Sequence, residues 1–139
     1  MKKVFRKISI VFPTLVIIGM LHNCSNADVA FQKQLTKSAN DMNKTYPAMV
    51  DRETRIDNVV ALPDKVFQYN FTFINLLKDS VDFVSMAREM QPNLLNGVKS
   101  SPDLKTFRDH RVTMAYQYSD KNGVFMFKIL ITPEKYQTN

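Results

Sequence analysis

The segment from Asp51 to Asp57 concentrates the side chains of this sequence that could do acid–base chemistry. Its charged residues are Asp51, Arg52, Glu53, Arg55 and Asp57. On an extended strand, residues two apart lie about 6.6 Å apart on one face, a separation that suits the paired carboxylates of a glycoside hydrolase. Arg55 lies between Glu53 and Asp57, however, and a nearby positive charge lowers the pKa of a carboxyl group. A cross-strand charge ladder or a partner-recognition surface therefore explains this segment better than catalysis does.

His110 is the other candidate for chemistry, since it follows Asp109 at an expected junction of helix and strand. Nucleophilic catalysis would need such a base beside a serine or cysteine. The sequence has no serine elbow, no glycine-rich phosphate loop and no dinucleotide fingerprint. A metal site would need several converging histidines, cysteines or carboxylates, and no such spacing occurs. We therefore expect a surface histidine in a turn, no catalytic residue, no metal, no cofactor and no enzymatic activity.

The first 27 residues have the order of a secretory signal. A basic start is followed by an apolar run from Ile8 to Leu21 and then by small, polar residues. As a helix the run would measure about 21 Å, which is short for a hydrocarbon core of ~30 Å. We therefore predict a signal peptide at residues 1–27 and a single domain at residues 28–139.

Three fates of this signal stay open on the sequence alone. The stretch ending at Cys24, Leu-x-x-Cys, resembles the lipobox of bacterial lipoproteins, although His22 and Asn23 depart from the small residues usual there. That resemblance implies that Cys24 carries the lipid and becomes the mature N-terminus. A cut after Ala27 would instead release a soluble chain, and an uncut signal would anchor the protein in the membrane. Each fate places the protein outside the cytoplasm, in the periplasm or associated with the outer membrane.

The net charge of the whole chain says little about its partners. It is +6, but four of the 19 lysines and arginines lie in the signal, whereas all 13 acidic residues follow it. The domain itself is therefore close to neutral and has no basic stripe that would suit nucleic acid. We expect no nucleic-acid partner, and membrane contact only through the signal or a lipid anchor.

Helices are expected in three places. Apolar residues recur at helical spacing between residues 29 and 44, and again after Ser80, which is a suitable N-cap. Pro92 should kink or split this second helix, and Gly97 can end it. Ser101 begins the cap, proline and acid signature of a further short helix.

Strands are expected at residues 49–62, 67–73, 112–118 and 124–132. The second of these alternates strictly, with Phe67, Tyr69, Phe71 and Phe73 on one face. The last two flank the turn-forming run Asp120–Gly123. The aromatic face, with Tyr116 and Tyr118, is either core beneath helices or the lining of a ligand groove.

This order of elements, α-β-β-α(-α)-β-β, predicts an α+β fold. We expect a four-stranded antiparallel sheet made of two hairpins, with the helices on one face. The last strand is apolar along almost its whole length, so we expect it in the centre of the sheet or at an oligomer contact.

Two blocks of sequence resemble small exported proteins of Gram-negative bacteria, a family without a known function. They are Met49–Asp57 followed by Tyr69–Thr72, and Phe107–Asp109 leading to Val112–Thr113 and Tyr118–Gly123. The resemblance implies an envelope or secreted protein and assigns no catalytic residue.

These observations favour a non-enzymatic envelope protein that binds another macromolecule. An accessory subunit of an envelope or secretion machine, an immunity protein and an inhibitor all fit, and the partner would be another envelope or secreted protein. The expected partner-binding residues are the charged set Asp51, Arg52, Glu53, Arg55 and Asp57. A periplasmic carrier of small apolar ligands is the alternative, and a small hydrolase is the weakest of the three. The sequence also leaves a homo-oligomer open.

Overall fold

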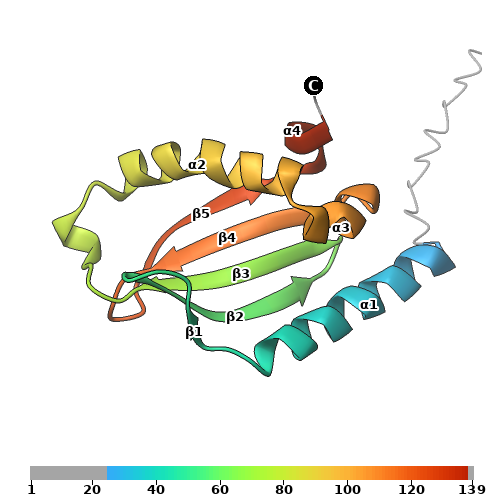
Figure 1. The fold of residues 1–139 in the computed structure, drawn as a ribbon, viewed down its shortest axis with the longest axis horizontal. Coiled ribbons are helices and arrows are strands. Elements are labelled where there is room, and N and C mark those ends of the chain that lie inside the picture. Colours follow the sequence, from blue (N-terminus) through green and yellow to red (C-terminus); the bar gives the residue numbers. More distant parts are fainter. Residues whose placement is uncertain (1–24, 138–139) are drawn as a thin grey trace, which may run out of the picture.

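The computed structural model describes residues 25–137, which form one mixed β-sheet with helices packed on one of its faces (Figure 1). The elements are α1 (Asn26–Asn43), β1 (Ala48–Met49), β2 (Thr54–Leu62), β3 (Val66–Phe73), a 3₁₀ turn (Lys78–Ser80), α2 (Phe83–Ser100), a second 3₁₀ turn (Pro102–Leu104), α3 (Lys105–Asp109), β4 (Thr113–Ser119), β5 (Phe125–Ile131) and α4 (Pro133–Gln137). Within the described residues, no helix is long and apolar enough to cross a membrane.

The strands lie in the order β1-β2-β3-β4-β5, with both predicted hairpins present. The α+β class is confirmed, but the prediction of four antiparallel strands is wrong. The sheet has five strands, and β3 pairs with β4 in parallel, Phe67 opposite Met114. The connection that carries α2 and α3 crosses one face of the sheet and brings the chain back to the end where β3 began. A crossover of this kind produces a parallel pair.

The last strand, β5, is at the edge of the sheet, so its predicted central position is also wrong. A register shift in its pairing with β4 turns two consecutive residues, Met126 and Phe127, towards the helices. Leu130, which alternates with the buried residues of β5, is 43% exposed on the opposite face of the sheet. Phe125, the first residue of the strand, is 49% exposed. The apolar run therefore reflects this bulge and the cover given by α2 and α4.

Helix α2 begins later and runs further than the sequence predicts. Its N-cap is Asp82, whose carboxylate accepts hydrogen bonds from the amides of Val84 and Ser85 at 3.1 and 3.0 Å. Ser80 lies in the preceding 3₁₀ turn instead. The helix continues without a break through the exposed Pro92 and past Gly97 to Ser100.

The core consists of two clusters of buried residues on the same face of the sheet. One cluster joins α1 to the sheet and contains Phe31, Leu35, Ala39, Ile56, Val59, Phe67 and Val112. The other cluster joins α2 and α4 to the sheet and contains Phe73, Val98, Met114, Tyr116, Tyr118, Met126, Phe127, Ile129, Ile131 and Tyr136. Tyr69 and Phe71 contact both clusters, so they mark the boundary between the part of the core under α1 and the part under α2.

Candidate partner-binding groove

Aromatic rings on β3 and β4 form a continuous strip between the two core clusters. Tyr69 lies opposite Tyr116, and Phe71 lies opposite Tyr118. The ring centroids of these pairs are 5.3 and 5.0 Å apart, with ring planes within 11° and 16° of parallel. Neighbouring rings along β3 are stacked as well, Tyr69 and Phe71 at 6.4 Å. The rings therefore stand side by side on the sheet as a single aromatic floor.

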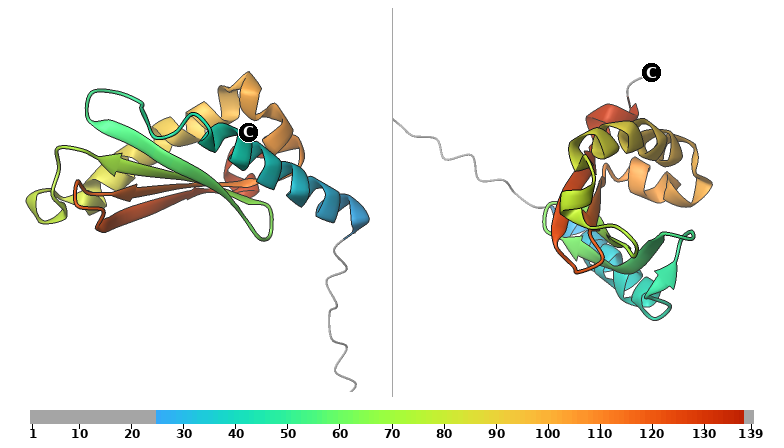
Figure 2. Two further views of the ribbon diagram at one scale, coloured as in Figure 1. Left: turned by 90° about the horizontal axis from the view of Figure 1, so that it is seen from below. Right: turned by 90° about the vertical axis from the view of Figure 1, so that its left-hand side faces the viewer.

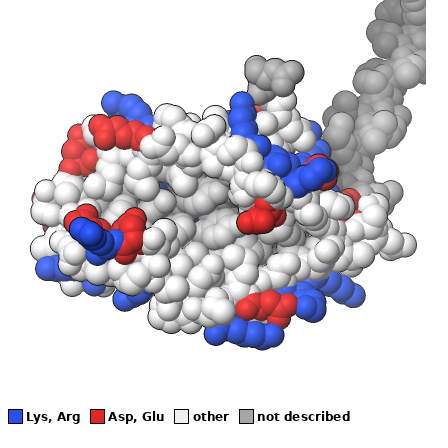
Figure 3. Space-filling model, viewed as in Figure 1, with Lys and Arg blue, Asp and Glu red and all other residues white. Residues whose placement is uncertain are grey.

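The helices do not cover this floor completely. The right-hand view of Figure 2 looks along the sheet. Helices α2 and α3 lie towards one edge of the sheet and α1 with β1 lies towards the other edge, so the cross-section resembles a letter C. The space-filling view of Figure 3 shows a hollow across this face between α2 and α1, lined largely by uncharged residues. Tyr69 and Phe71 are only partly buried, in keeping with their position beneath this hollow. We call this hollow the groove.

Side-chain amides attach one wall of the groove, α1, to the free edge of β2. The Nδ2 group of Asn43 donates to the Val59 carbonyl at 2.8 Å, and its Oδ1 accepts from the Val59 amide at 2.8 Å. At the other end of the helix, Gln32 donates to the Leu62 carbonyl at 3.0 Å. These bonds satisfy backbone groups that no neighbouring strand reaches, and they fix the helix beside the sheet.

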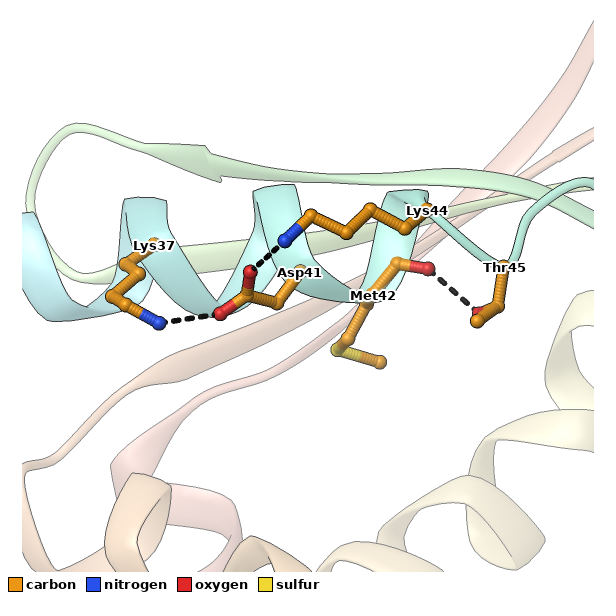
Figure 4. Close-up of polar contacts among 5 residues, drawn as sticks. All are labelled: Lys37, Asp41, Met42, Lys44 and Thr45. Carbon is orange, nitrogen blue, oxygen red and sulfur yellow. Dashed lines mark hydrogen bonds and ion pairs between the residues drawn. The ribbon is translucent and has the colours of Figure 1, made fainter.

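The last turns of α1 are drawn in close-up in Figure 4. Met42 points from the helix into the space that α1 shares with α2. Asp41 accepts from Lys37 and Lys44 at 2.6 Å each, and these hydrogen bonds lower the pKa of its carboxyl group to about 2. The Thr45 hydroxyl donates to the Met42 carbonyl at 2.8 Å. Met42 therefore projects from a helix end that several polar contacts hold in place.

The opposite wall is helix α2, whose partly buried apolar residues include two methionines. Met86, Met90 and Leu94 follow one another at intervals of four, and all three are partly buried against the cluster that contains Tyr116 and Tyr118. Methionine side chains adapt their shape easily, a property common at surfaces that bind peptides. The ring of Phe107 on α3 packs against both core clusters, 4.9 Å from the ring of Phe67.

Three tyrosine hydroxyls on the floor have no hydrogen-bond partner among the described residues. The hydroxyl of Tyr136, outside the groove, donates to the Val112 carbonyl at 3.0 Å. Those of Tyr69, Tyr116 and Tyr118 make no hydrogen bond within the described part of the chain, in which no buried side-chain nitrogen or oxygen lacks a partner. Solvent therefore reaches these hydroxyls, and a bound molecule could reach them too.

The tyrosine hydroxyls of the floor stay neutral across the physiological pH range. Burial raises the pKa of Tyr116 to about 12, and burial followed by the charge of neighbouring groups raises the pKa of Tyr69 and Tyr118 as well. A neutral phenol both donates and accepts a hydrogen bond. The floor is thus apolar along its rings and polar at their outer ends.

The charged set expected to bind a partner is divided between two places. Asp51, Arg52 and Glu53 precede β2, in the loop at the open end of the groove, where charged side chains gather at the left of Figure 3. Asp51 accepts from the backbone amides of Glu53 and Thr54 at 2.8 Å each, and these bonds hold the loop. Because β2 begins at Thr54, the whole set does not share one extended strand.

Arg55 and Asp57 lie on the face of the sheet that no helix covers. Arg55 donates to Asp57, which also accepts from the Thr72 hydroxyl at 2.6 Å. Thr72 alternates with the floor residues Phe71 and Phe73, which places these side chains on the reverse face. They form a cross-strand link of the kind that the sequence predicts as one explanation of this segment.

The described residues contain no group of three or more histidines, cysteines and carboxylates arranged to hold a metal. The ring of His110 stacks on Phe31 at a centroid distance of 3.9 Å, and Asp109 accepts from Lys105 rather than from the imidazole. Sequence reasoning expected this histidine at the surface, and it is exposed. Cys24, the predicted lipidation site, lies outside the described residues.

Sequence reasoning did not identify the α2 wall, and it left the floor undecided between core and groove. The methionines of α2 recur every four residues, and the tyrosines of β3 and β4 alternate with polar residues. Such patterns also occur in ordinary cores, so they do not reveal an open groove. A pocket of about 450 Å³ between the first turns of α1 and the β2–β3 turn, lined by Val29 and Pro63 among others, lies away from the aromatic floor.

Comparison with known proteins places the chain in a family. A family model described as a domain of unknown function, DUF8479, matches residues 30–127. The chain belongs to the DUF8479 family. The match extends from the second turn of α1 into β5, so the DUF8479 domain includes both walls and the floor of the groove. No curated protein matches the chain by sequence.

Solved structures share the fold of this DUF8479 domain at low sequence identity. A candidate secreted protein of Pseudomonas aeruginosa is 13% identical, with a TM-score of 0.61 over 81% of this chain and 97% of its own. The pilotin EpsS of the Vibrio vulnificus type 2 secretion system is 7% identical, with a TM-score of 0.63 over 80% and 96%. The type II secretion system pilotin AspS of Vibrio cholerae is 11% identical, with a TM-score of 0.56 over 77% and 93%.

Proposed function

We propose that this protein is a non-enzymatic accessory protein of the bacterial envelope that holds a segment of a partner protein in the groove. The aromatic floor between two helical walls, where Tyr69 and Phe71 are only partly buried, carries the proposal. An apolar surface that a folded chain leaves uncovered commonly marks a binding site. The floor is fixed by ring stacking and the α1 wall by hydrogen bonds to β2, so the site is formed before the partner arrives.

The fold supports an envelope role by analogy. Two structures that share it are pilotins of type II secretion systems, and a third is a candidate secreted protein. A shared fold does not by itself transfer a function. It agrees, however, with the secretory signal at residues 1–27 and with an accessory subunit of a secretion or envelope machine.

The start of α1 favours lipidation at Cys24 among the fates of the signal. Ser25 is the N-cap of this helix, and its hydroxyl oxygen accepts from the Asp28 amide at 3.2 Å. Processing at Cys24 would retain this cap, whereas a cut after Ala27 would remove it together with the first two helical residues. We propose that the mature protein begins at a lipidated Cys24 and is attached to the membrane there.

The groove is tested by charged substitutions on its two walls. Met42→Glu on α1 and Met90→Glu on α2 should each abolish capture of the partner from detergent extracts of the producing cell, because a carboxylate on the apolar wall would lose its water on binding. Val60→Glu is the matched control, since Val60 is 39% exposed and pairs with Gln68 on the reverse face.

All three variants should melt within a few degrees of the wild type. Capture that survives both wall substitutions and fails in Val60→Glu would contradict the proposal and indicate the reverse face instead. A tight complex with lipids or small aromatic compounds, without a protein partner, would favour the carrier alternative.

A further inference from the structure

Two tyrosine side chains at the open end of the groove are almost fully buried while their hydroxyls are unpaired. Tyr118 is 3% exposed and Tyr116 is 9% exposed. Neither hydroxyl makes a hydrogen bond within the described residues, yet both reach solvent at the floor. The ring of Tyr118 is wedged between Phe71 and Phe73, with centroid distances of 5.0 and 5.2 Å, so its hydroxyl has a fixed position.

The loop that carries Asp51 lies beside the ring of Tyr118. The amide of Thr54 donates to Asp51, Thr54 pairs with Phe73, and the ring of Phe73 stacks on that of Tyr118 at 5.2 Å. Burial is the main cause of the raised pKa of the Tyr118 hydroxyl, and Tyr116 and the negative charge of Asp51 raise this pKa further. The pKa of Asp51 itself is lowered by the amides of Glu53 and Thr54, so the group is ionised at neutral pH. Its loop is also held firmly, because the amide of Ile74 at the end of β3 donates to the Glu53 carbonyl at 2.9 Å.

We infer that the partner segment places a lysine or arginine side chain at this end of the groove, with its cation between the carboxylate of Asp51 and the hydroxyl of Tyr118. This inference rests on the proposed function. A cation satisfies both groups, because an ionised carboxylate and a neutral phenol oxygen each accept from an N–H donor. The aliphatic stem of such a residue would lie along the rings of Phe71 and Phe73.

Apolar and acidic side chains of a partner would satisfy the carboxylate of Asp51 and the tyrosine hydroxyls less well than a cation does. An apolar side chain would cover the hydroxyls of Tyr116 and Tyr118 without giving them a partner, which is costly. An acidic side chain would be repelled by Asp51 and Glu53. Arg52 supplies one positive charge to the same loop, which leaves the loop with an excess of one negative charge.

The test uses the mature chain and a random-peptide phage library. Peptides are selected on the immobilised protein, and those that no longer bind the Met42→Glu variant are assigned to the groove. We expect these peptides to share a lysine or arginine beside apolar residues. Replacing that residue with norleucine should weaken binding about tenfold or more, the usual effect of losing a hydrogen bond to a charged group.

Two variants of the protein test the position of the cation. Asp51→Asn keeps an oxygen to accept from the loop amides, and Tyr118→Phe keeps the ring, so both should fold. Each variant should weaken the binding of the basic peptides about tenfold or more and leave the binding of the norleucine peptides unchanged. Asp64→Asn is the control, because Asp64 lies at the far β2–β3 turn with φ of 60°, which asparagine tolerates.

The outcomes separate the two claims. Groove-binding peptides without a basic residue would overturn this inference and leave the proposed function standing. Basic peptides whose affinity is unchanged by Asp51→Asn and Tyr118→Phe would overturn it as well. If every selected peptide still binds Met42→Glu and Met90→Glu, the proposed function fails and this inference fails with it.

Discussion

Asn43 and Val59 are joined by two hydrogen bonds of 2.8 Å each, one in each direction. The side-chain amide of Asn43 thus takes the place of a neighbouring strand at the free edge of β2. It also sets the distance between α1 and the sheet at the end of the helix that carries Met42. The width of the groove therefore depends on a contact between a helix and a sheet edge.

We expect Asn43→Ala to destabilise the fold by about 2 kcal/mol, because the amide and carbonyl of Val59 would lose their partners while partly buried. Partner binding should also weaken, by more than the loss of folding stability accounts for, since α1 would no longer be fixed. Urea denaturation and a binding assay measure the two effects. Asn40→Ala, an exposed position on the same helix, is the control. An equal effect of both substitutions on stability would contradict the role given to Asn43.

Acid should destabilise the protein through carboxyl groups whose pKa is lowered by folding. The lysines beside Asp41 hold the pKa of its carboxyl group at about 2. For Asp120, burial opposes ionisation, but hydrogen bonds from the amides of Lys78, Val124 and Asn122 outweigh it and lower the pKa. The unfolded chain, with values near 3.8, binds protons first.

The stabilising contribution of these groups is thus complete above pH ~4 and is lost as the pH falls towards about 2. Urea midpoints measured at neutral pH and at about pH 5 should be similar, and the midpoint at about pH 2.5 should be lower. Asp41→Asn should reduce the decline, because it removes one of the groups responsible. An identical decline in this variant and the wild type would show that Asp41 does not contribute.

The charged segment divides into a groove part and a reverse-face part, and the two should differ in binding. Arg52→Glu changes the charge of the loop beside the groove and should alter partner affinity severalfold. Arg55→Glu, on the reverse face, should leave affinity unchanged and cost less than about 1 kcal/mol, since its ion pair with Asp57 is partly exposed. The opposite pattern would place the partner on the reverse face of the sheet.

The intact mass of the mature protein tests the fate of the signal. We expect a chain that begins at Cys24 and carries acyl groups, recovered in the detergent fraction. Cys24→Ser should abolish the acylated form. A soluble form that begins at Asp28 would contradict the lipid anchor, and an uncut chain would contradict the signal peptide itself.

The helices and strands of the domain followed largely from the sequence, because local patterns determine them. The strict alternation from Phe67 to Phe73 predicted β3, and the run Asp120–Gly123 predicted the turn before β5, where Gly123 has φ of 79°. The start of α2 was missed because Ser80 and Asp82 are both good caps. The choice between them depends on the 3₁₀ turn that precedes the helix.

The topology of the sheet was not predictable from local pattern. Whether β4 joins β3 in parallel or antiparallel depends on the path of the crossover, which no single residue determines. The sequence also left open whether the aromatic face is core or groove, because Tyr69 and Phe71 have the same sequence pattern as core residues. Only the separation of α1 from α2, fixed in part by Asn43, leaves their rings open.

Site-specific photo-cross-linking in the producing cell tests the central claim most directly. A photoreactive phenylalanine analogue would replace Met42 or Met90 on the groove walls, and Val60 or Leu130 on the reverse face. The proposed function predicts that both groove positions cross-link to one envelope protein, and that both reverse-face positions do not. Adducts at Val60 and Leu130 with none at Met42 and Met90 would contradict it.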